Sequence, residues 1–298
     1  MHQMRYLIET VRQLEDVHYG ASFHLFEREV APGRGFKDLL AKPESNPKIA
    51  KTPRLSQFDS NPKIAKSGKE GVLTVPLHLA PADRSGFNMC ACHTEACKAA
   101  CLHTAGNPAH MAGKDRARIA RTLAYMNDRE RFMDDLAREI AGHHRRAVRL
   151  NMLAAVRLNA TSDVAWERVP FEYNGERHPN IMAAFPEVQF YDYTKITKRA
   201  LASLQGEWPD NYHITFSLSE NNDAAAAQVL EAGGNVAAVF RLNPSQPMPT
   251  DYTINGVTRP VINGEEHDFR PIDDQNVIVG LRAKGLAKHD TSGFVREP

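Results

Sequence analysis

All four cysteines of the chain lie within residues 90–101, at Cys90, Cys92, Cys97 and Cys101. Thiolates are soft ligands, and a segment this rich in them can surround one metal centre, which suits zinc or an iron–sulfur cluster. Cys97 and Cys101 stand at positions i and i+4, so they would face the same side of a helical turn. The fold must therefore position this segment, and metal binding is the leading hypothesis.

The spacing of the cysteines favours an iron–sulfur cluster over zinc. Structural zinc sites usually have two well separated pairs of ligands, and this chain has no second, remote pair. Three thiolates on one loop can hold a [4Fe-4S] cluster whose fourth iron is left open or is closed by Cys92. A zinc site and free or regulatory thiols remain the alternatives.

Composition is that of a soluble globular protein. The chain has 298 residues, of which 42% are hydrophobic and 24% charged, enough for one large α/β domain or two small ones. The formal net charge of +1 gives no global electrostatic argument for a nucleic acid or membrane partner. No apolar run approaches the roughly 20 residues of a membrane span, so a cytoplasmic protein is expected. A reducing compartment argues against disulfides.

The first 70 residues are predicted to form a short helix, at residues 6–17, and an arm. Residues 32–70 are rich in Pro, Gly, Ser and Lys and contain one sequence twice, at residues 45–51 and 60–66. Two copies are too few for a repeat fold, so this segment is expected to be an arm or lid. Its lysines could contact phosphates or simply form a solvated surface. They are Lys48, Lys51, Lys63, Lys66 and Lys69.

An α/β metal-binding domain is predicted for residues 71–298, because β-rich runs alternate there with helical segments. The first strand is predicted at residues 71–80, with Pro76 at an edge or bulge. One bent helix or two consecutive helices are expected over residues 114–144. Later strands are predicted at residues 154–159, 188–192, 212–216, 235–240 and 276–281, and helices at residues 198–204 and 223–232.

This alternation predicts a mostly parallel sheet that is covered on both faces. About six strands favour a partial (β/α) barrel with the cysteine-rich metal loop after its first strand. A doubly wound open sheet is the alternative, since strand order cannot be read from the sequence. Neither a Gly-x-Gly-x-x-Gly motif nor a phosphate-binding P-loop follows any predicted strand.

Polar residues follow the predicted strands and are expected to share the carboxyl-terminal rim of the sheet, where active sites of such folds collect. Each could instead cap a helix or form a surface pair. Residues 265–273 are densely ionisable and could bind substrate or a cation, or form a polar hairpin. The candidate substrate-binding residues are Asn159, Ser162, Asp163, Asp192, Lys195, Ser217, Ser219, Glu220 and Arg282.

Several of these motifs resemble the bacteriophage gene product 88 family, a group without settled function. The resemblance covers about residues 45–284 and implies a phage protein made in the bacterial cytoplasm. Cys90, Cys97 and Cys101 match the family's cysteines, whereas Cys92 departs from the pattern. The motifs are residues 46–51, 67–71, 77–80, 90–106, 159–163 and 190–195.

A more distant similarity of layout is to radical S-adenosylmethionine enzymes, whose three-cysteine loop follows the first strand of a partial six-stranded barrel. Their usual spacing is Cys-x3-Cys-x2-Cys, whereas this chain has Cys-x6-Cys-x3-Cys. The similarity is therefore an analogy of fold. Two functions are expected on these grounds. One is an iron–sulfur enzyme that binds S-adenosylmethionine or another small ligand; the other is a non-catalytic iron–sulfur or zinc module in phage nucleic-acid transactions.

Overall fold

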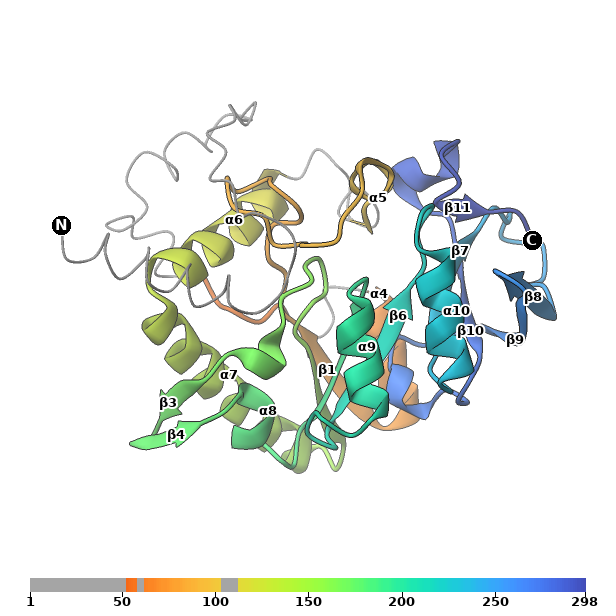
Figure 1. Cartoon of the computed structure of the whole chain (residues 1–298). Helices are drawn as coiled ribbons and strands as arrows, with labels where there is room; N and C mark the ends of the chain where they lie inside the picture. Colours follow the sequence, from red (N-terminus) through yellow and green to blue (C-terminus); the bar gives the residue numbers. More distant parts are fainter. Residues whose placement is uncertain (1–51, 58–61, 103–111) are drawn as a thin grey trace.

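The computed structural model describes residues 52–57, 62–102 and 112–298, and its centre is a nine-stranded, mostly parallel sheet (Figure 1). Six parallel strands lie side by side in the order of the chain. Among these six strands the order does not reverse, as it would at the centre of a doubly wound sheet. The six strands are β1 (Val72–Pro76), β2 (Leu153–Arg157), β5 (Gln189–Thr194), β6 (Tyr212–Ser217), β7 (Val236–Phe240) and β10 (Ile278–Arg282).

Three more strands extend the sheet beyond the predicted number of about six. β9 (Val257–Asn263) pairs in parallel with β10, and β8 (Asp251–Ile254) pairs with β9 in antiparallel fashion. β11 (Val295–Arg296) pairs with the end of β7, beyond the two residues that β6 contacts there. A separate hairpin joins β3 (Phe171–Tyr173) to β4 (Glu176–His178).

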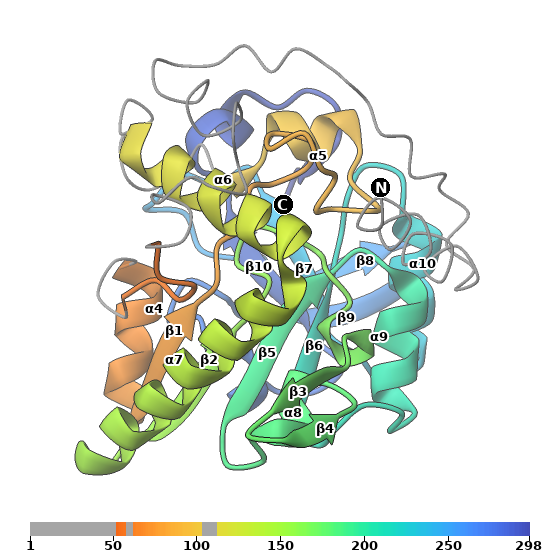
Figure 2. The same ribbon diagram turned by 90° about the vertical axis from the view of Figure 1, so that its left-hand side faces the viewer.

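One face of the sheet is apolar and carries the long helices. Val156, Phe190, Phe216 and Val236 belong to the main core and are fully buried. Figure 2 shows the two longest helices crossing in front of the sheet. Asp128 separates these two helices and accepts a hydrogen bond from the backbone of the third residue after it, as an N-cap does. The helices are α6 (Ala112–Asn127), α7 (Arg129–Arg149), α9 (Thr197–Leu204) and α10 (Asp223–Glu231).

The opposite face of the sheet is polar, because side chains alternate along each strand. Arg157, Tyr191 and His213 lie on this face, next to a small apolar cluster built around Phe269. Residues 62–70 contact this side of β1, with Ile64 and Ser67 fully buried. The covering elements are α4 (Pro62–Lys66), η2 (Ser67–Glu70) and η5 (Arg270–Ile272).

The prediction of alternating strands and helices is confirmed for the described residues from Val72 onward. Each of the six predicted strands is present, and Pro76 lies in the edge strand β1. β1 ends four residues before the predicted end at Ala80, and the other strand ends lie within about two residues of those predicted. The long helical segment, predicted as one bent helix or two consecutive helices, forms two helices that are separated at Asp128. The helix predicted at residues 6–17 and most of the arm fall outside the described residues. Among the described helices, none is long and apolar enough to cross a membrane.

Gly280 tests how closely β9 and β10 pack. A Cβ atom at Gly280 would lie 2.8 Å from Val261 Cγ1 and 2.9 Å from Met248 Sδ. Gly280→Ala should therefore lower the free energy of unfolding by about 1–3 kcal/mol. Gly142→Ala is the control, because that Cβ would meet only Arg145 Nη2, at 3.8 Å, on a helix. It should raise stability by about 0.5–1 kcal/mol. Urea unfolding followed by circular dichroism measures both, and an unchanged midpoint for Gly280→Ala would contradict the packing.

Candidate functional site at the carboxyl end of the sheet

Cys90 is anchored to the segment that follows β2. The backbone N–H of Asp163 donates to the Met89 carbonyl at 2.8 Å, and Cys90 pairs with Asp163 in an isolated parallel bridge. The backbone N–H of Ala82 points at Cys90 Sγ, 3.4 Å away. Burial raises the pKa of the Cys90 thiol to about 12. Cys90 is thus a fixed, inward-facing thiol at the rim of the sheet.

Cys97 lies on α5 (Glu95–Ala99), a short helix that the C-terminal segment supports. The Thr94 hydroxyl accepts a hydrogen bond from Cys97 N at 3.0 Å and caps the helix. Lys98 ties α5 to the loop before Cys90 through an ion pair of 2.8 Å with Asp83. Figure 1 shows α5 beside β11. One apolar cluster joins the α5 segment to the C-terminal part of the chain, and it contains Ala96, Cys97, Ala100, Ala283, Ala287, Phe294 and Val295.

Three of the four thiols share one neighbourhood. Cys97 and Cys101 both contribute to the raised pKa of Cys90, which requires their sulfurs to be near it. Cys92 is exposed, and its electrostatic neighbours are Asp163 and Lys195. In the described residues, no three His, Cys, Asp or Glu side chains are grouped closely enough to hold a metal ion. The donor types suit a soft metal, but the cysteine segment would have to tighten to coordinate one.

Asp163 is committed to the fold. Its Oδ1 accepts hydrogen bonds from Thr194 Oγ1 at 2.8 Å and from Arg199 Nη1 at 2.6 Å, and its Oδ2 accepts one from Lys195 N at 2.9 Å. Arg199 is 1% exposed and makes a bidentate pair with Glu167, at 2.6 and 2.8 Å. Both oxygens of Asp163 are therefore used in joining the segment after β2 to β5 and α9.

Asn159, Ser162 and Asp192 also form a buried network rather than an open binding surface. Asn159 donates to Asp192 through its backbone N–H, at 2.5 Å, and through Nδ2, at 3.2 Å. Its Oδ1 accepts from the Ser162 hydroxyl at 2.9 Å and from Trp166 Nε1 at 3.1 Å. Tyr212 donates its hydroxyl to Asp192 at 2.9 Å. These three predicted binding residues instead shape the turn after β2.

Lys195 and Ser217 lie next to the cysteine segment. Lys195 Nζ donates to Ser217 Oγ at 2.8 Å and lies 5.5 Å from the centre of the Phe294 ring. Lys195 also acts electrostatically on Cys92. The ammonium group is held between β6, the C-terminal segment and the cysteines, so it can contact a ligand bound at this rim.

The three remaining candidates differ from one another. Ser219 is buried, at 1% exposure, in the turn before α10. Glu220 is half-buried, and in the described part of the chain its Oε2 is enclosed without a hydrogen-bond partner. Arg282 donates to the carbonyls of Asn243 and Gln246, at 2.6 and 2.5 Å. Glu220 therefore keeps a free acceptor, whereas Arg282 holds the loop after β7.

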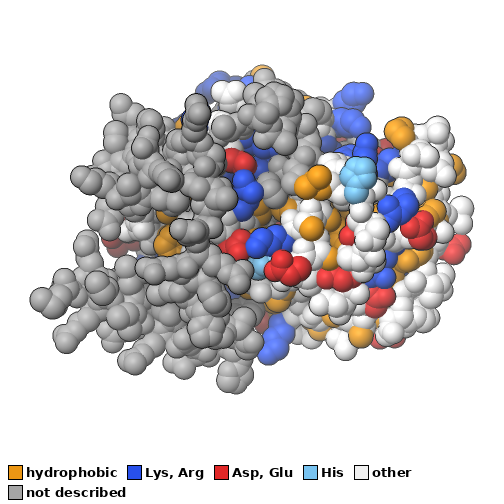
Figure 3. Space-filling model, turned by 90° about the horizontal axis from the view of Figure 1, so that it is seen from above, with side chains coloured by type: hydrophobic (Ala, Val, Ile, Leu, Met, Phe, Trp, Pro, Cys, Tyr) orange, Lys and Arg blue, Asp and Glu red, His pale blue; other side chains and the backbone are white. Residues whose placement is uncertain are grey.

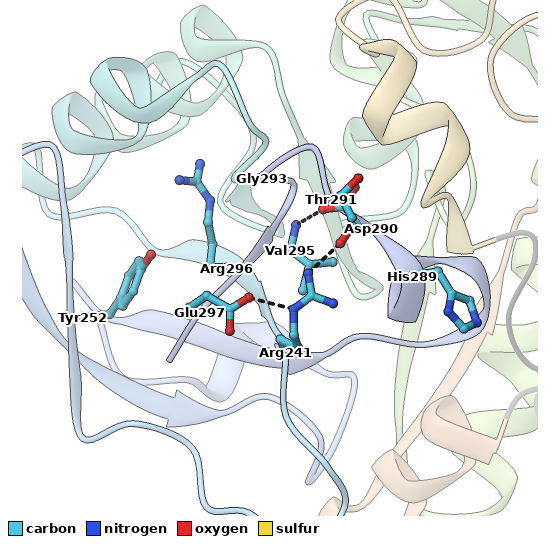
Figure 4. Close-up of a pocket in the computed structure, with 9 residues that line it drawn as sticks. All are labelled: Arg241, Tyr252, His289, Asp290, Thr291, Gly293, Val295, Arg296 and Glu297. Atoms are coloured by element: carbon cyan, nitrogen blue, oxygen red, sulfur yellow. Dashed lines mark hydrogen bonds and ion pairs between the residues drawn. The ribbon is translucent and has the colours of Figure 1, made fainter.

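The C-terminal segment also lines a pocket of about 660 Å³, shown in Figure 4. Arg241 and Glu297 point toward one another there, with Nε and Oε1 2.7 Å apart. Arg241 also donates to the Asp290 carbonyl at 2.6 Å, and Arg296 pairs with Asp223 on α10. Both arginines of the pocket are thus engaged in holding the C-terminal segment.

Comparison with known proteins gives one result. The sequence matches the family model of gene product 88 over residues 45–298. The chain belongs to the gene product 88 family. No curated protein and no solved structure matches it. The family match leaves the similarity to radical S-adenosylmethionine enzymes a prediction.

This member of the gene product 88 family has a buried ion cluster that the sequence did not predict. Arg157 Nη1 donates to both oxygens of Asp268, at 3.1 and 3.0 Å, and Tyr191 donates to the same carboxylate at 3.0 Å. Lys63 Nζ lies 3.9 Å from Asp268, and burial lowers its pKa to about 8. Residues 265–273 thus neutralise the polar face of the sheet instead of forming a hairpin. The sequence held one signal of this polar face: Tyr191 and Tyr193 alternate along β5 with residues that point to the other face.

Arg199 should be essential for stability in this gene product 88 protein. Arg199→Ala would leave Glu167, whose side chain is fully buried, and Asp163 without their cation. We expect a loss of about 3–5 kcal/mol in the free energy of unfolding. Arg138→Ala is the control, because Arg138 also pairs with two carboxylates but its side chain is 59% exposed. Denaturant titration should show little change there, and similar small losses for both variants would contradict the role of Arg199.

Asp192 should make stability depend on pH. Burial raises its pKa to about 7, although hydrogen bonds from Asn159 and Tyr212 lower it. The folded state then holds a proton that the unfolded state has released above about pH 4, so stability should fall as pH rises from about 4 to 7 and level off above that range. Asp273 adds in the same direction, because burial raises its pKa to about 6. Asp192→Asn should flatten the curve in denaturant titrations, and an unaltered slope would exclude this assignment.

Proposed function

We propose that this protein is an iron–sulfur enzyme in which Cys90, Cys97 and Cys101 hold a [4Fe-4S] cluster. The main support is the position of these thiols, which share one neighbourhood at the carboxyl end of the first of six parallel strands in chain order. We further propose that these strands curve into a partial barrel, with the cluster at its mouth. Active sites of such folds lie at this end.

The three-cysteine set leaves one iron of the cluster with an exchangeable position. Cys92 has Asp163 and Lys195 as its neighbours, which supports a site of three thiolates rather than four. A bound cluster would supply a Lewis-acidic iron and one-electron chemistry. S-adenosylmethionine, which carries an amino and a carboxylate group, is the proposed class of ligand for that iron.

The rim residues proposed to hold the ligand are reduced to three. The carboxylate oxygens of Asp163 accept hydrogen bonds from Arg199 and its neighbours, and those of Asp192 accept them from Asn159 and its neighbours. Both are therefore positioning residues. Lys195, Ser217 and Glu220 remain as groups that a ligand can contact. In this proposal Lys195 pairs with a carboxylate of the ligand, and Glu220 accepts a hydrogen bond from an amino or hydroxyl group.

The alternative, a nucleic-acid module that uses the lysines of residues 48–69, has less support. Lys63 faces Asp268 inside the protein, and Lys66 Nζ donates to the Glu265 carbonyl at 2.9 Å. Lys69 is exposed, whereas Lys48 and Lys51 lie outside the described residues. A continuous basic surface is therefore not formed by the described lysines of this group.

Iron content of protein purified without oxygen tests the proposal. Wild type and Cys92→Ser should each bind about four iron atoms per chain and be brown, whereas Cys90→Ala, Cys97→Ala and Cys101→Ala should lose the cluster. S-adenosylmethionine should alter the paramagnetic resonance spectrum of the reduced wild-type protein. Lys195→Gln should weaken that effect without loss of iron, because Lys195 lies outside the ligand set.

Two results would reject parts of this proposal. Equal iron content in wild type and Cys97→Ala, or zinc in place of iron, would remove the cluster. A spectral change on adding S-adenosylmethionine that occurs only in Cys92→Ser would show that Cys92 closes the fourth iron. The protein would then be an electron-transfer or structural protein.

A further inference from the structure

A buried arginine on α6 lacks a hydrogen-bond partner for two of its nitrogens. Arg118 is 6% exposed, and among the described residues nothing accepts a hydrogen bond from its Nε or Nη1. Its nearest carboxylate oxygen in an ion pair is Asp115 Oδ1, 3.9 Å from Nη1, which is too long for a hydrogen bond. A buried guanidinium left in this way costs free energy unless a ligand completes it.

Arg118 belongs to a cationic cluster beside the cysteines. Asp115 is shared with Arg84, whose Nη2 lies 2.8 Å from Asp115 Oδ2, and Lys114 lies within electrostatic reach of both arginines. Burial lowers the pKa of Arg118, and Asp115 and Cys101 oppose this shift, which places Cys101 close to the guanidinium. Arg84 and Arg118 thus share one carboxylate, which leaves a formal excess of one positive charge on this pair.

Among the described residues, the groups around the two arginines do not cancel this excess. Arg121 lies within electrostatic reach of Arg118, and Glu139 offsets the charge of Arg121. His78 faces the same arginines and is neutral, because burial and these cations hold its pKa well below its usual range. Figure 3, which views the molecule from above, shows Lys and Arg side chains next to Asp and Glu side chains near the centre of the view.

We propose that Arg118, Arg84 and Lys114 form a binding site for the terminal phosphate of a small molecule. A phosphate monoester carries nearly two negative charges at neutral pH and offers several acceptor oxygens, which match the excess charge and the open nitrogens of Arg118. A terminal group can reach a side chain that is 6% exposed, whereas the backbone of a duplex cannot follow it inward. Because Cys101 is adjacent, this site places the phosphate end of a ligand next to the cysteines.

Inorganic phosphate is the first probe, used with the full-length protein without metal and with chloride at matched ionic strength. Calorimetric titration should give saturable binding at one site per chain, which Arg118→Gln should weaken at least tenfold. Arg84→Gln and Lys114→Gln should each weaken it several-fold, so the test survives if Arg118→Gln does not fold. Arg138→Gln, an exposed arginine on α7, is the control and should bind phosphate as the wild type does.

Two further arms define the ligand. A nucleoside monophosphate should compete with inorganic phosphate, and an oligonucleotide without terminal phosphates should not. Cys97→Ala should still bind phosphate, so failure of the cluster proposal and failure of this one can be told apart. Equal phosphate affinity in wild type and Arg118→Gln, or binding of the oligonucleotide that depends on Arg118, would overturn the site.

Discussion

The buried charge of Arg199 is the interaction on which the rim of the sheet depends. Its guanidinium contacts Glu167, Asp163 and Tyr212, which come from the segment after β2 and from β6. Burying a charge is tolerated only when hydrogen bonds and opposite charge surround it, and here both are present. Asp163 in turn pairs through its backbone with the segment that ends at Cys90. The position of the first cysteine therefore depends on an ion pair made by a helix later in the chain.

The second support of the cysteine segment is apolar and comes from the end of the chain. β11 pairs with β7 where β6 no longer does, and Phe294 and Val295 pack against Cys97. The same segment places Phe294 under the ammonium group of Lys195. The topology of the sheet thus brings together Cys97, Lys195 after β5 and Phe294 near the C-terminus. It does so because the carboxyl ends of parallel strands share one rim.

The strands and helices could be predicted from the sequence because each is a local pattern of apolar residues. The two hairpins were missed although each turns at an Asn-Gly pair with positive φ, at Asn174-Gly175 and Asn255-Gly256. The partners of buried charges could not be predicted, because Arg157 and Asp268 are far apart in the chain and only the folded sheet joins them. For the same reason Asp163 and Asp192 looked like ligand-binding residues. Polar residues after strands serve the fold and the ligand alike, and sequence alone does not separate the two uses.

The division of charge on the rim suggests what it can accept. The carboxylates of Asp163 and Asp192 are occupied by Arg199 and by neighbouring donors, whereas the cations Arg118 and Lys195 lie beside Cys101 and Cys92. Thiolates, iron–sulfur clusters bound to them and phosphates all bring negative charge, and a buried site must offset such charge locally. Fixed cations near the thiols lower the cost of ionising them, as they do for reactive cysteines elsewhere. The same cations would hold an anionic ligand. The positive charges that favour metal binding by the thiolates would therefore also favour binding of the ligand.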